Sequence, residues 1–206
     1  MRILGLTGSI GMGKSTAAHL LRRMRVPVHD ADAAVHQLLG PGGAAIRAVG
    51  QAFPGVVRHG AVDRPKLGAR VFGAGGQGAL ARLEAILHPL VRRETQRWLA
   101  TQARRRAPVV VLDVPLLYER TFPASYDSVL VVSASATLQR LRVLRRPAMT
   151  QAKFADILRR QMPDREKRRL ADATVISALG YRPTRAGLQR ALRRLRRRGA
   201  WRPGYR

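Results

Sequence analysis

A glycine-rich segment near the start of the chain constrains the fold more than any other feature. Residues 8–16 read Gly-Ser-Ile-Gly-Met-Gly-Lys-Ser-Thr, which satisfies the pattern G-x-x-x-x-G-K-[ST]. A short apolar run at 3–6 precedes this segment, and apolar residues follow it at helical spacing, at 17, 20, 21 and 24. Strand, glycine loop and helix in this order are typical of a phosphate-binding loop.

The residue types of this segment each suit the binding of a nucleotide. Gly8, Gly11 and Gly13 allow positive φ and a close approach of the backbone to a phosphate, and successive N–H groups form an anion-binding nest. Lys14 is expected to reach the β- and γ-phosphates, and the Ser15 hydroxyl to ligate Mg²⁺. The predicted ATP-binding residues of the loop are Gly8, Ser9, Ile10, Gly11, Met12, Gly13, Lys14, Ser15 and Thr16.

The composition of the chain excludes some kinds of protein and some kinds of site. The chain has 206 residues, of which 46% are hydrophobic, enough for one compact unit with small subdomains. It contains no cysteine, which excludes disulfides and thiolate metal sites. We see no signal peptide and no apolar run as long as a membrane span. We therefore expect a cytoplasmic enzyme with no membrane partner, and no feature specifies an oligomeric state.

The formal net charge of +27 is the most unusual feature of the composition, and all but four of the 39 basic residues are arginine. Such a charge favours nucleic acid or anionic surfaces electrostatically. The arginines, however, are scattered and barely interleaved with aromatic residues, which favours solvated helix faces. We expect salt-sensitive adhesion to RNA or DNA without a specific nucleic-acid partner. A basic nucleic-acid-binding protein is the non-enzymatic alternative.

Short apolar runs alternate with helical patterns along the chain. The runs lie at 3–6, 26–28, 109–112, 129–132 and 174–176. This alternation predicts βαβ units, a parallel sheet and an α/β fold. About 80 residues separate the second and third runs, more than a crossover requires. We interpret 33–105 as a mostly helical insertion that forms a substrate pocket, with helices at roughly 43–53, 79–87 and 89–105.

The pattern near the C-terminus predicts an amphipathic helix with an arginine-rich outer side. Thr184 is its candidate N-cap, and Leu188, Leu192 and Leu195 share one face.

Two carboxylates, Asp30 and Asp32, follow the second predicted strand. In an open parallel sheet, ligands bind outside the carboxyl ends of the strands. A carboxylate there can accept the proton of a substrate hydroxyl as that oxygen attacks the γ-phosphate. The alternative role is an N-cap for the following helix. Beside a phosphate-binding loop we favour catalysis by one of the two, with Asp32 as the base.

Three further groups of residues are candidates for the functional site, and each could instead have a purely structural role. Asp113 closes the run at 109–112 and either lies near Mg²⁺ or caps the following turn. His88 and Arg92 share a helix face, with Pro89 at the first helical position, and suit an anionic, ring-bearing substrate; a cap and a surface arginine are the alternative. Arg142, Arg145 and Arg146 could neutralise a transferred phosphate, although a single arginine is weak evidence in this chain.

Taken together, these residues resemble the dephospho-CoA kinase family. The matching segments are 6–16, 28–32, 64–67, 71–72, 83–89, 112–119, 139–142, 160–162 and 171–172. The pieces Ile86–Pro89 and Pro115–Glu119 are more specific than the loop. The resemblance implies transfer of the ATP γ-phosphate, with Mg²⁺, to the ribose 3′-hydroxyl of dephospho-CoA in the last step of coenzyme A synthesis. A nucleoside or nucleoside-monophosphate kinase is the alternative enzyme.

The resemblance also implies an architecture and a site. It implies a P-loop kinase core of five parallel strands with helices on both faces, at 1–32, 106–138 and 169–206, a helical CoA-binding domain at 33–105 and a lid at 139–168. It makes Asp32 the base, with Lys14 and Arg142 as further catalytic residues. Arg142 and Arg146 would contact ATP, and Ser15 and Asp113 the metal. The implied substrate-binding residues are Thr7, Asp30, Asp32, Arg64, His88, Arg92, Pro115, Leu116, Leu117 and Glu119.

This chain departs from the family pattern at two places. Ser9 stands where the family commonly has glycine, and 176–180 reads Ile-Ser-Ala-Leu-Gly where many members have Asn-x-Gly near adenine.

Overall fold

The computed structural model describes residues 1–73, 78–119 and 126–197. The chain divides into two compact units. One comprises Met1–His29 with Gln102–Arg206, and the other comprises Asp30–Thr101.

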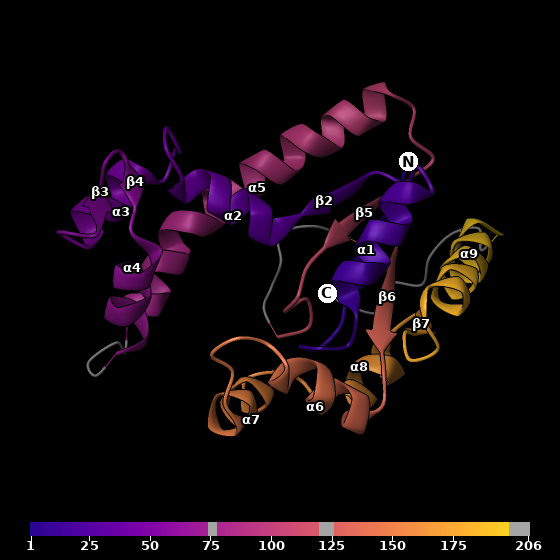
Figure 1. Cartoon of the computed structure of the whole chain (residues 1–206). Helices are drawn as coiled ribbons and strands as arrows, with labels where there is room; N and C mark the ends of the chain where they lie inside the picture. The colour runs from indigo at the N-terminus through magenta and orange to yellow at the C-terminus, as the bar shows by residue number, and fades with distance from the viewer. Residues whose placement is uncertain (74–77, 120–125, 198–206) are drawn as a thin grey trace. The chain divides into compact units, whose positions relative to one another are not determined.

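The first unit is built on a five-stranded parallel sheet with the strand order β2-β5-β1-β6-β7 (Figure 1). In the central strand β1, Ile3 lies opposite Val110 of β5, and Gly5 lies opposite Val129 of β6. Every residue of β5 is buried, as expected for an apolar run without alternation. The expected α/β fold is confirmed. The strands are β1 Arg2–Thr7, β2 Val28–Asp30, β5 Val109–Asp113, β6 Ser128–Ser133 and β7 Ala173–Ile176.

Helices α1 and α9 cover one face of this sheet. Leu21 of α1 and Leu188 of α9 are fully buried in the core that these helices form with the strands. On the other face, Gly5 lies against Leu117 and Tyr126, and burial raises the pKa of the Tyr126 hydroxyl. Helices α6, α7 and α8 lie beyond the carboxyl end of β6 (Figure 1). The helices are α1 Lys14–Arg23, α6 Ala136–Leu144, α7 Gln151–Arg159, α8 Asp164–Leu170 and α9 Tyr181–Arg197.

Helix α9 begins earlier than the sequence pattern predicts. Thr184 is not its N-cap: the helix starts at Tyr181, and the buried Thr184 hydroxyl donates back to the Gly180 carbonyl at 2.7 Å. Pro183 is tolerated because the N–H groups of a first turn have no intrahelical partner. Leu188 and Leu192 are buried as expected, whereas the side chain of Leu195 lies outside the described residues.

The second unit is mostly helical. Between its helices it has a β-hairpin with a two-residue turn, which the sequence did not predict. His59 and Gly60 form its turn with φ of 47° and 71°, the backbone conformation that joins twisted strands most directly. The elements are α2 Ala31–Leu39, α3 Ile46–Ala52, β3 Val57–Arg58, β4 Ala61–Val62, α4 Arg64–Phe72 and α5 Ala79–Arg104, the last of which continues into the first unit.

One helix, α5, replaces the two expected at 79–87 and 89–105. Pro89 lies inside it and not at a first helical position, so that expectation was wrong. An internal proline removes one backbone hydrogen bond and crowds the preceding turn. Leu87 and Val91, on either side of it, are buried and offset part of that cost. Although α5 has 26 residues, no helix in the described part of the chain is long and apolar enough to cross a membrane.

The burial of Leu188 predicts a measurable stability difference. Leu188→Ala should lower the free energy of unfolding by about 3 kcal/mol, because it leaves a cavity between α9 and the sheet. Leu179→Ala is the matched control: its side chain is 73% exposed, and the loss should stay below about 0.5 kcal/mol. Urea unfolding of both variants measures the difference, and equal midpoints would contradict the core assignment.

Candidate functional site

The glycine-rich loop lies between β1 and α1, as expected, but its glycines are required for more than one reason. Gly11 and Gly13 have φ of 77° and 89°, as expected, whereas Gly8 does not have a positive φ. A Cβ on Gly8 would lie 2.6 Å from the Val132 carbonyl oxygen, and one on Gly13 would lie 2.6 Å from Ser177 Oγ. The loop therefore packs closely on the protein around it, in addition to any approach to a phosphate.

The N-terminus of α1 offers free N–H groups. The N-cap residue is Gly13, which has no side chain to accept a hydrogen bond, and the first turn contains no acidic residue. The helix dipole and the first amides therefore present positive potential at the end of the loop. Ser15 lies exposed in this first turn.

Lys14 and Asp113 form an ion pair at the carboxyl end of β5. Lys14 Nζ lies 2.7 Å from Asp113 Oδ1, and the side chains are 16% and 3% exposed. The pair directs the ammonium group of Lys14 to the edge of the sheet where the loop lies. Asp113 thus contacts the lysine of the loop, a contact that neither interpretation of its role from sequence foresaw.

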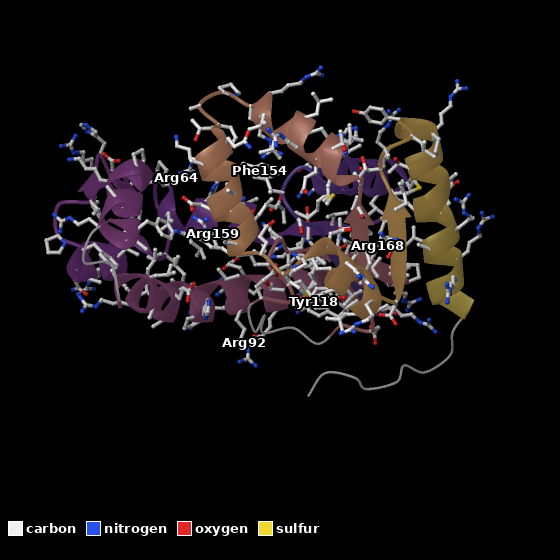
Figure 2. All side chains as sticks on the ribbon, turned by 90° about the horizontal axis from the view of Figure 1, so that it is seen from below. Arg64, Arg92, Tyr118, Phe154, Arg159 and Arg168 are labelled. Carbon is white, nitrogen blue, oxygen red and sulfur yellow. The ribbon has the colours of Figure 1, made fainter. Side chains whose placement is uncertain are left out.

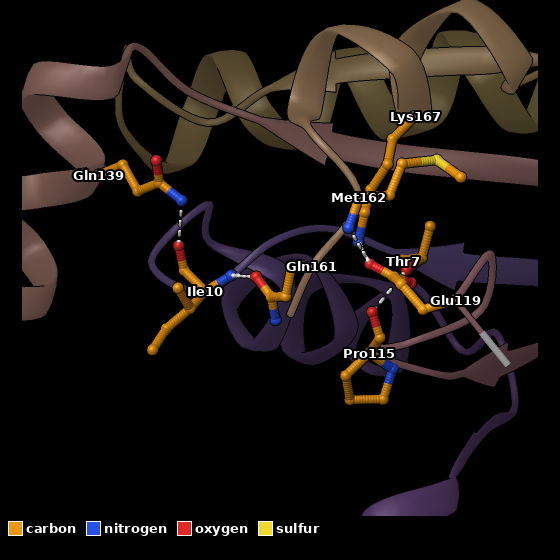
Figure 3. Close-up of polar contacts among 8 residues, drawn as sticks. All are labelled: Thr7, Ile10, Pro115, Glu119, Gln139, Gln161, Met162 and Lys167. Atoms are coloured by element: carbon orange, nitrogen blue, oxygen red, sulfur yellow. Dashed lines mark hydrogen bonds and ion pairs between the residues drawn. The ribbon is translucent and has the colours of Figure 1, made fainter. Parts of the chain in front are cut away.

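Two glutamines hold the peptide groups of Ile10 in the middle of the loop (Figure 3). Gln139 Nε2 of α6 donates to the Ile10 carbonyl at 2.8 Å. Gln161 Oε1, which follows α7, accepts from the Ile10 N–H at 3.0 Å. The loop is therefore anchored from both ends of the segment 139–161.

Arg142 and Ser177 hold the next peptide groups of the loop. The Arg142 guanidinium donates to the Gly11 carbonyl at 3.3 Å, and to Ser177 Oγ and the Ser177 carbonyl, both at 2.9 Å. Ser177 Oγ in turn donates to the Met12 carbonyl at 2.7 Å. Arg142 thus contacts the backbone of the predicted ATP-binding loop, and its contact with ATP remains a prediction. Arg146 is exposed.

The segment Pro115–Glu119 is held at both ends. Thr7 Oγ1 donates to the Pro115 carbonyl at 3.0 Å. Glu119 Oε1 accepts from the Met162 N–H at 2.8 Å and lies 2.7 Å from Lys167 Nζ (Figure 3). Between these ends, Leu117 is buried against Gly5, and Pro115 and Leu116 are partly exposed.

Lys167 is the largest fully buried side chain in the described part of the chain. It is 0% exposed and its ion-pair partner Glu119 is 12% exposed. The second oxygen of Glu119 has no hydrogen-bond partner among the described residues. A buried pair with incomplete hydrogen bonding costs desolvation energy, which suggests a role other than stability.

The remaining predicted substrate residues lie in the second unit. Asp30 is the N-cap of α2, and its Oδ1 accepts from the Ala33 N–H at 3.0 Å. Asp32 is exposed in the first turn of α2, and its carboxylate bonds to no other described residue. His88 and Arg92 lie four residues apart on α5, where both are exposed and Arg92 projects outward (Figure 2). Arg64 is the exposed first residue of α4.

The described residues contain no cluster of three or more histidine, cysteine or acidic side chains. A metal ion bound near the loop would therefore not be held by three or more such side chains of the described residues. This agrees with the chemistry of Mg²⁺, which usually combines one or two carboxylates with waters and substrate phosphates. The Asp113 carboxylate and the Ser15 hydroxyl are oxygen donors of the type that Mg²⁺ prefers.

Sequence reasoning missed four residues whose side chains form hydrogen bonds or an ion pair with the loop or the segment Pro115–Glu119: Gln139, Gln161, Lys167 and Ser177. Gln139 and Gln161 lie 129 and 151 positions from Ile10 in the sequence. Periodicity and local motifs carry no information on such distant pairs. The one available signal was that both glutamines lie within segments that carry the family resemblance.

Comparisons with known proteins agree with the resemblance to the dephospho-CoA kinase family. A family model described as dephospho-CoA kinase matches residues 2–179. A dephospho-CoA kinase of Rhodospirillum rubrum is 56% identical over 99% of this chain and 97% of its own length. One of Paramagnetospirillum magneticum is 61% identical over 82% of this chain and 78% of its own length.

Solved structures share the architecture. A crystal structure from Thermus thermophilus is 33% identical, with a TM-score of 0.81 over 94% of this chain and 96% of that chain. A dephospho-CoA kinase from Campylobacter jejuni, 20% identical with a TM-score of 0.62 over 94% and 97% of the two chains, has the same fold.

The buried ion pair predicts an asymmetric response to substitution. Glu119→Gln should lower the free energy of unfolding by about 3 kcal/mol, because it leaves the Lys167 ammonium buried without a counter-charge. The double variant Glu119→Gln with Lys167→Met should recover most of this loss, since no charge is left buried. Urea unfolding measures both values.

The control is Glu94→Gln, which breaks the Glu94–Arg97 pair, whose side chains are 43% and 67% exposed. Its effect should stay below about 1 kcal/mol. A single Glu119→Gln variant as stable as the control would show that the buried charge is not energetically coupled to its partner.

Proposed function

Since the chain belongs to the dephospho-CoA kinase family and is an ATP-dependent kinase of dephospho-CoA, we propose how its own residues perform the transfer. The γ-phosphate of ATP passes to the 3′-hydroxyl of the ribose. The bond between the γ-phosphorus and the oxygen that bridges to the β-phosphate breaks, and ADP leaves. The observation that carries the assignment of roles is that Asp30 is occupied as a helix cap, whereas the neighbouring Asp32 carboxylate is exposed and unpaired among the described residues.

The loop and Lys14 bind and orient the triphosphate in this proposal. The uncapped amides at the start of α1 face the phosphates, and the Lys14 ammonium neutralises charge that spreads over the transferred group. The Asp113 carboxylate and the Ser15 hydroxyl would hold Mg²⁺, which supplies charge neutralisation between the β- and γ-phosphates when it is bound. Lys14 Nζ and Asp113 Oδ1 lie 2.7 Å apart, so the residues proposed to contact the phosphates and the metal ion are adjacent.

Asp32 is the base in this proposal. It lies two residues after the end of β2, and ligands of open α/β sheets bind beyond the carboxyl ends of the strands. Its carboxylate accepts the proton of the 3′-hydroxyl as that oxygen attacks the γ-phosphorus. His88, Arg92 and Arg64 are exposed residues of the same unit and would contact the anionic parts of dephospho-CoA.

We also propose that Arg142 and Arg146 belong to a lid and that the enzyme acts in the cytoplasm. The acceptor site, in this proposal, is lined by Pro115, Leu116 and Leu117. The support for the acceptor residues is the anchoring of their segment at Thr7, directly before the phosphate-binding loop. The role of Glu119 in substrate binding stays a prediction. Its Oε1 contacts Lys167 Nζ and the Met162 N–H, and we propose that these contacts also make it a positioning residue of the segment.

Turnover tests the substrate assignment directly. The protein incubated with ATP, Mg²⁺ and dephospho-CoA should release ADP and CoA in equal amounts. Nucleosides and nucleoside monophosphates, offered in parallel, should give little ADP above the acceptor-free control. Folded protein that phosphorylates a nucleoside and leaves dephospho-CoA unchanged would exclude the proposed substrate.

Substitution of the two adjacent carboxylates tests the base. Asp32→Asn should lower kcat by roughly 10² or more and leave the dissociation constant of ATP nearly unchanged, since the amide cannot accept the proton. Asp30→Asn retains a capping oxygen for α2, so its loss of kcat should be at least roughly tenfold smaller than that of Asp32→Asn. Pre-steady-state measurement of ADP formation gives both values, and a reversed order would assign the base to Asp30.

A further inference from the structure

The two adjacent residues Gln161 and Met162 bridge the phosphate-binding loop and the segment Pro115–Glu119. Gln161 Oε1 accepts from the N–H of Ile10 at 3.0 Å, and the N–H of Met162 donates to Glu119 Oε1 at 2.8 Å (Figure 3). One peptide unit therefore separates a contact with the predicted ATP site from a contact with the predicted acceptor site. We name Gln161 and Met162 the bridge.

The bridge is anchored to the body of the first unit on its C-terminal side. Helix α8 follows directly, and its Lys167 holds the same Glu119 oxygen by the buried ion pair at 2.7 Å. Asp164 Oδ2 of α8 accepts from Ser133 Oγ at the end of β6 at 2.7 Å. Because Glu119 is held by two groups of the segment 162–167, a displacement of this segment has to displace Glu119 as well.

At its other end, the segment Pro115–Glu119 contacts the loop side directly through Thr7, which precedes Gly8. The segment thus has two separate connections to the loop: through Thr7 at its start, and through the bridge at its end. The Thr7 contact belongs to the rigid end of β1, where Thr7 is fully buried. The bridge, by contrast, is only partly buried and follows α7, within the range 139–168 that we propose as a lid.

We propose that Gln161 and Glu119 are positioning residues that couple the binding of ATP to the binding of dephospho-CoA through the bridge. This inference rests on the proposed function. ATP orders the loop and with it the Ile10 N–H, which fixes Gln161. Met162 then holds Glu119 and the segment 115–119 in one position. Dephospho-CoA meets a segment that is already ordered, and each ligand therefore tightens the binding of the other.

A Gln161→Met variant tests the coupling, because it keeps the length of the side chain and removes the acceptor. Gln139→Met is the matched control: it removes a hydrogen bond to the same residue, Ile10, but from α6 and on the carbonyl side. The measurement is the dissociation constant of the non-hydrolysable analogue adenylyl imidodiphosphate with Mg²⁺, by calorimetry, with and without saturating dephospho-CoA.

In the wild type, dephospho-CoA should tighten the binding of the analogue at least about fivefold. Both glutamine variants should bind the analogue alone more weakly than the wild type. The tightening should persist in Gln139→Met and fall below about twofold in Gln161→Met. If Gln161 had only a structural role, both variants would bind the analogue more weakly to a similar extent. Dephospho-CoA would then still tighten the binding of the analogue in both.

A second pair of variants tests the other end of the bridge without leaving a charge buried. Lys167→Met combined with Glu119→Gln keeps an oxygen for the Met162 N–H and should retain the tightening. Lys167→Met combined with Glu119→Met removes that oxygen and should lose it. The comparison also covers the case in which Gln161→Met does not fold.

Three outcomes overturn the inference. Wild-type protein that binds both ligands independently refutes coupling while leaving the proposed function in place. Tightening that survives in both Gln161→Met and the Glu119→Met double variant refutes the role of the bridge. Wild-type protein that binds the analogue but neither binds nor phosphorylates dephospho-CoA contradicts the proposed function and, with it, this inference.

Discussion

The close packing of the glycine loop on its surroundings is the constraint on which the nucleotide-binding unit depends. The loop backbone lies so close to Val132 and Ser177 that a methyl group on Gly8 or Gly13 would not fit. The peptide groups of the loop therefore need hydrogen-bond partners within the protein. Gln139, Gln161, Arg142 and Ser177 do so for Ile10, Gly11 and Met12. These side chains come from α6 and from the segments after α7 and β7. The peptide groups of the loop are therefore held by side chains that lie more than a hundred positions away in the sequence.

The buried Glu119–Lys167 pair follows a different logic. Two charges taken out of water with incomplete hydrogen bonding contribute little net stability, and apolar residues of similar size would serve the core as well. What the pair provides is a fixed position for one carboxylate oxygen, which also receives the Met162 N–H. In a kinase, a ligand-dependent connection between the two substrate sites lowers the chance that the γ-phosphate is transferred to water before the acceptor is bound.

Much of the fold could be predicted from the sequence, because its signals are local. The unalternating run that became β5 indicated a strand buried on both faces. Each of the five runs overlaps one strand of the sheet, although the run at 26–28 shares only its last residue with β2. The errors arose where packing overrides local preference. Pro89 was expected to begin a helix, and α5 passes through it with Leu87 and Val91 buried on either side. Thr184 was expected to cap α9 and instead lies buried inside its first turn.

By itself, the sequence determined the phosphate-binding loop, the α/β class and the family, since each depends on residue types at short fixed spacings. Tertiary structure decided which groups meet across long separations: that Lys14 pairs with Asp113, and that Glu119 is held from α8. The physical reason is that a hydrogen bond or ion pair depends on distance in space. The pattern along a chain specifies spatial distance only within one helix, strand or turn.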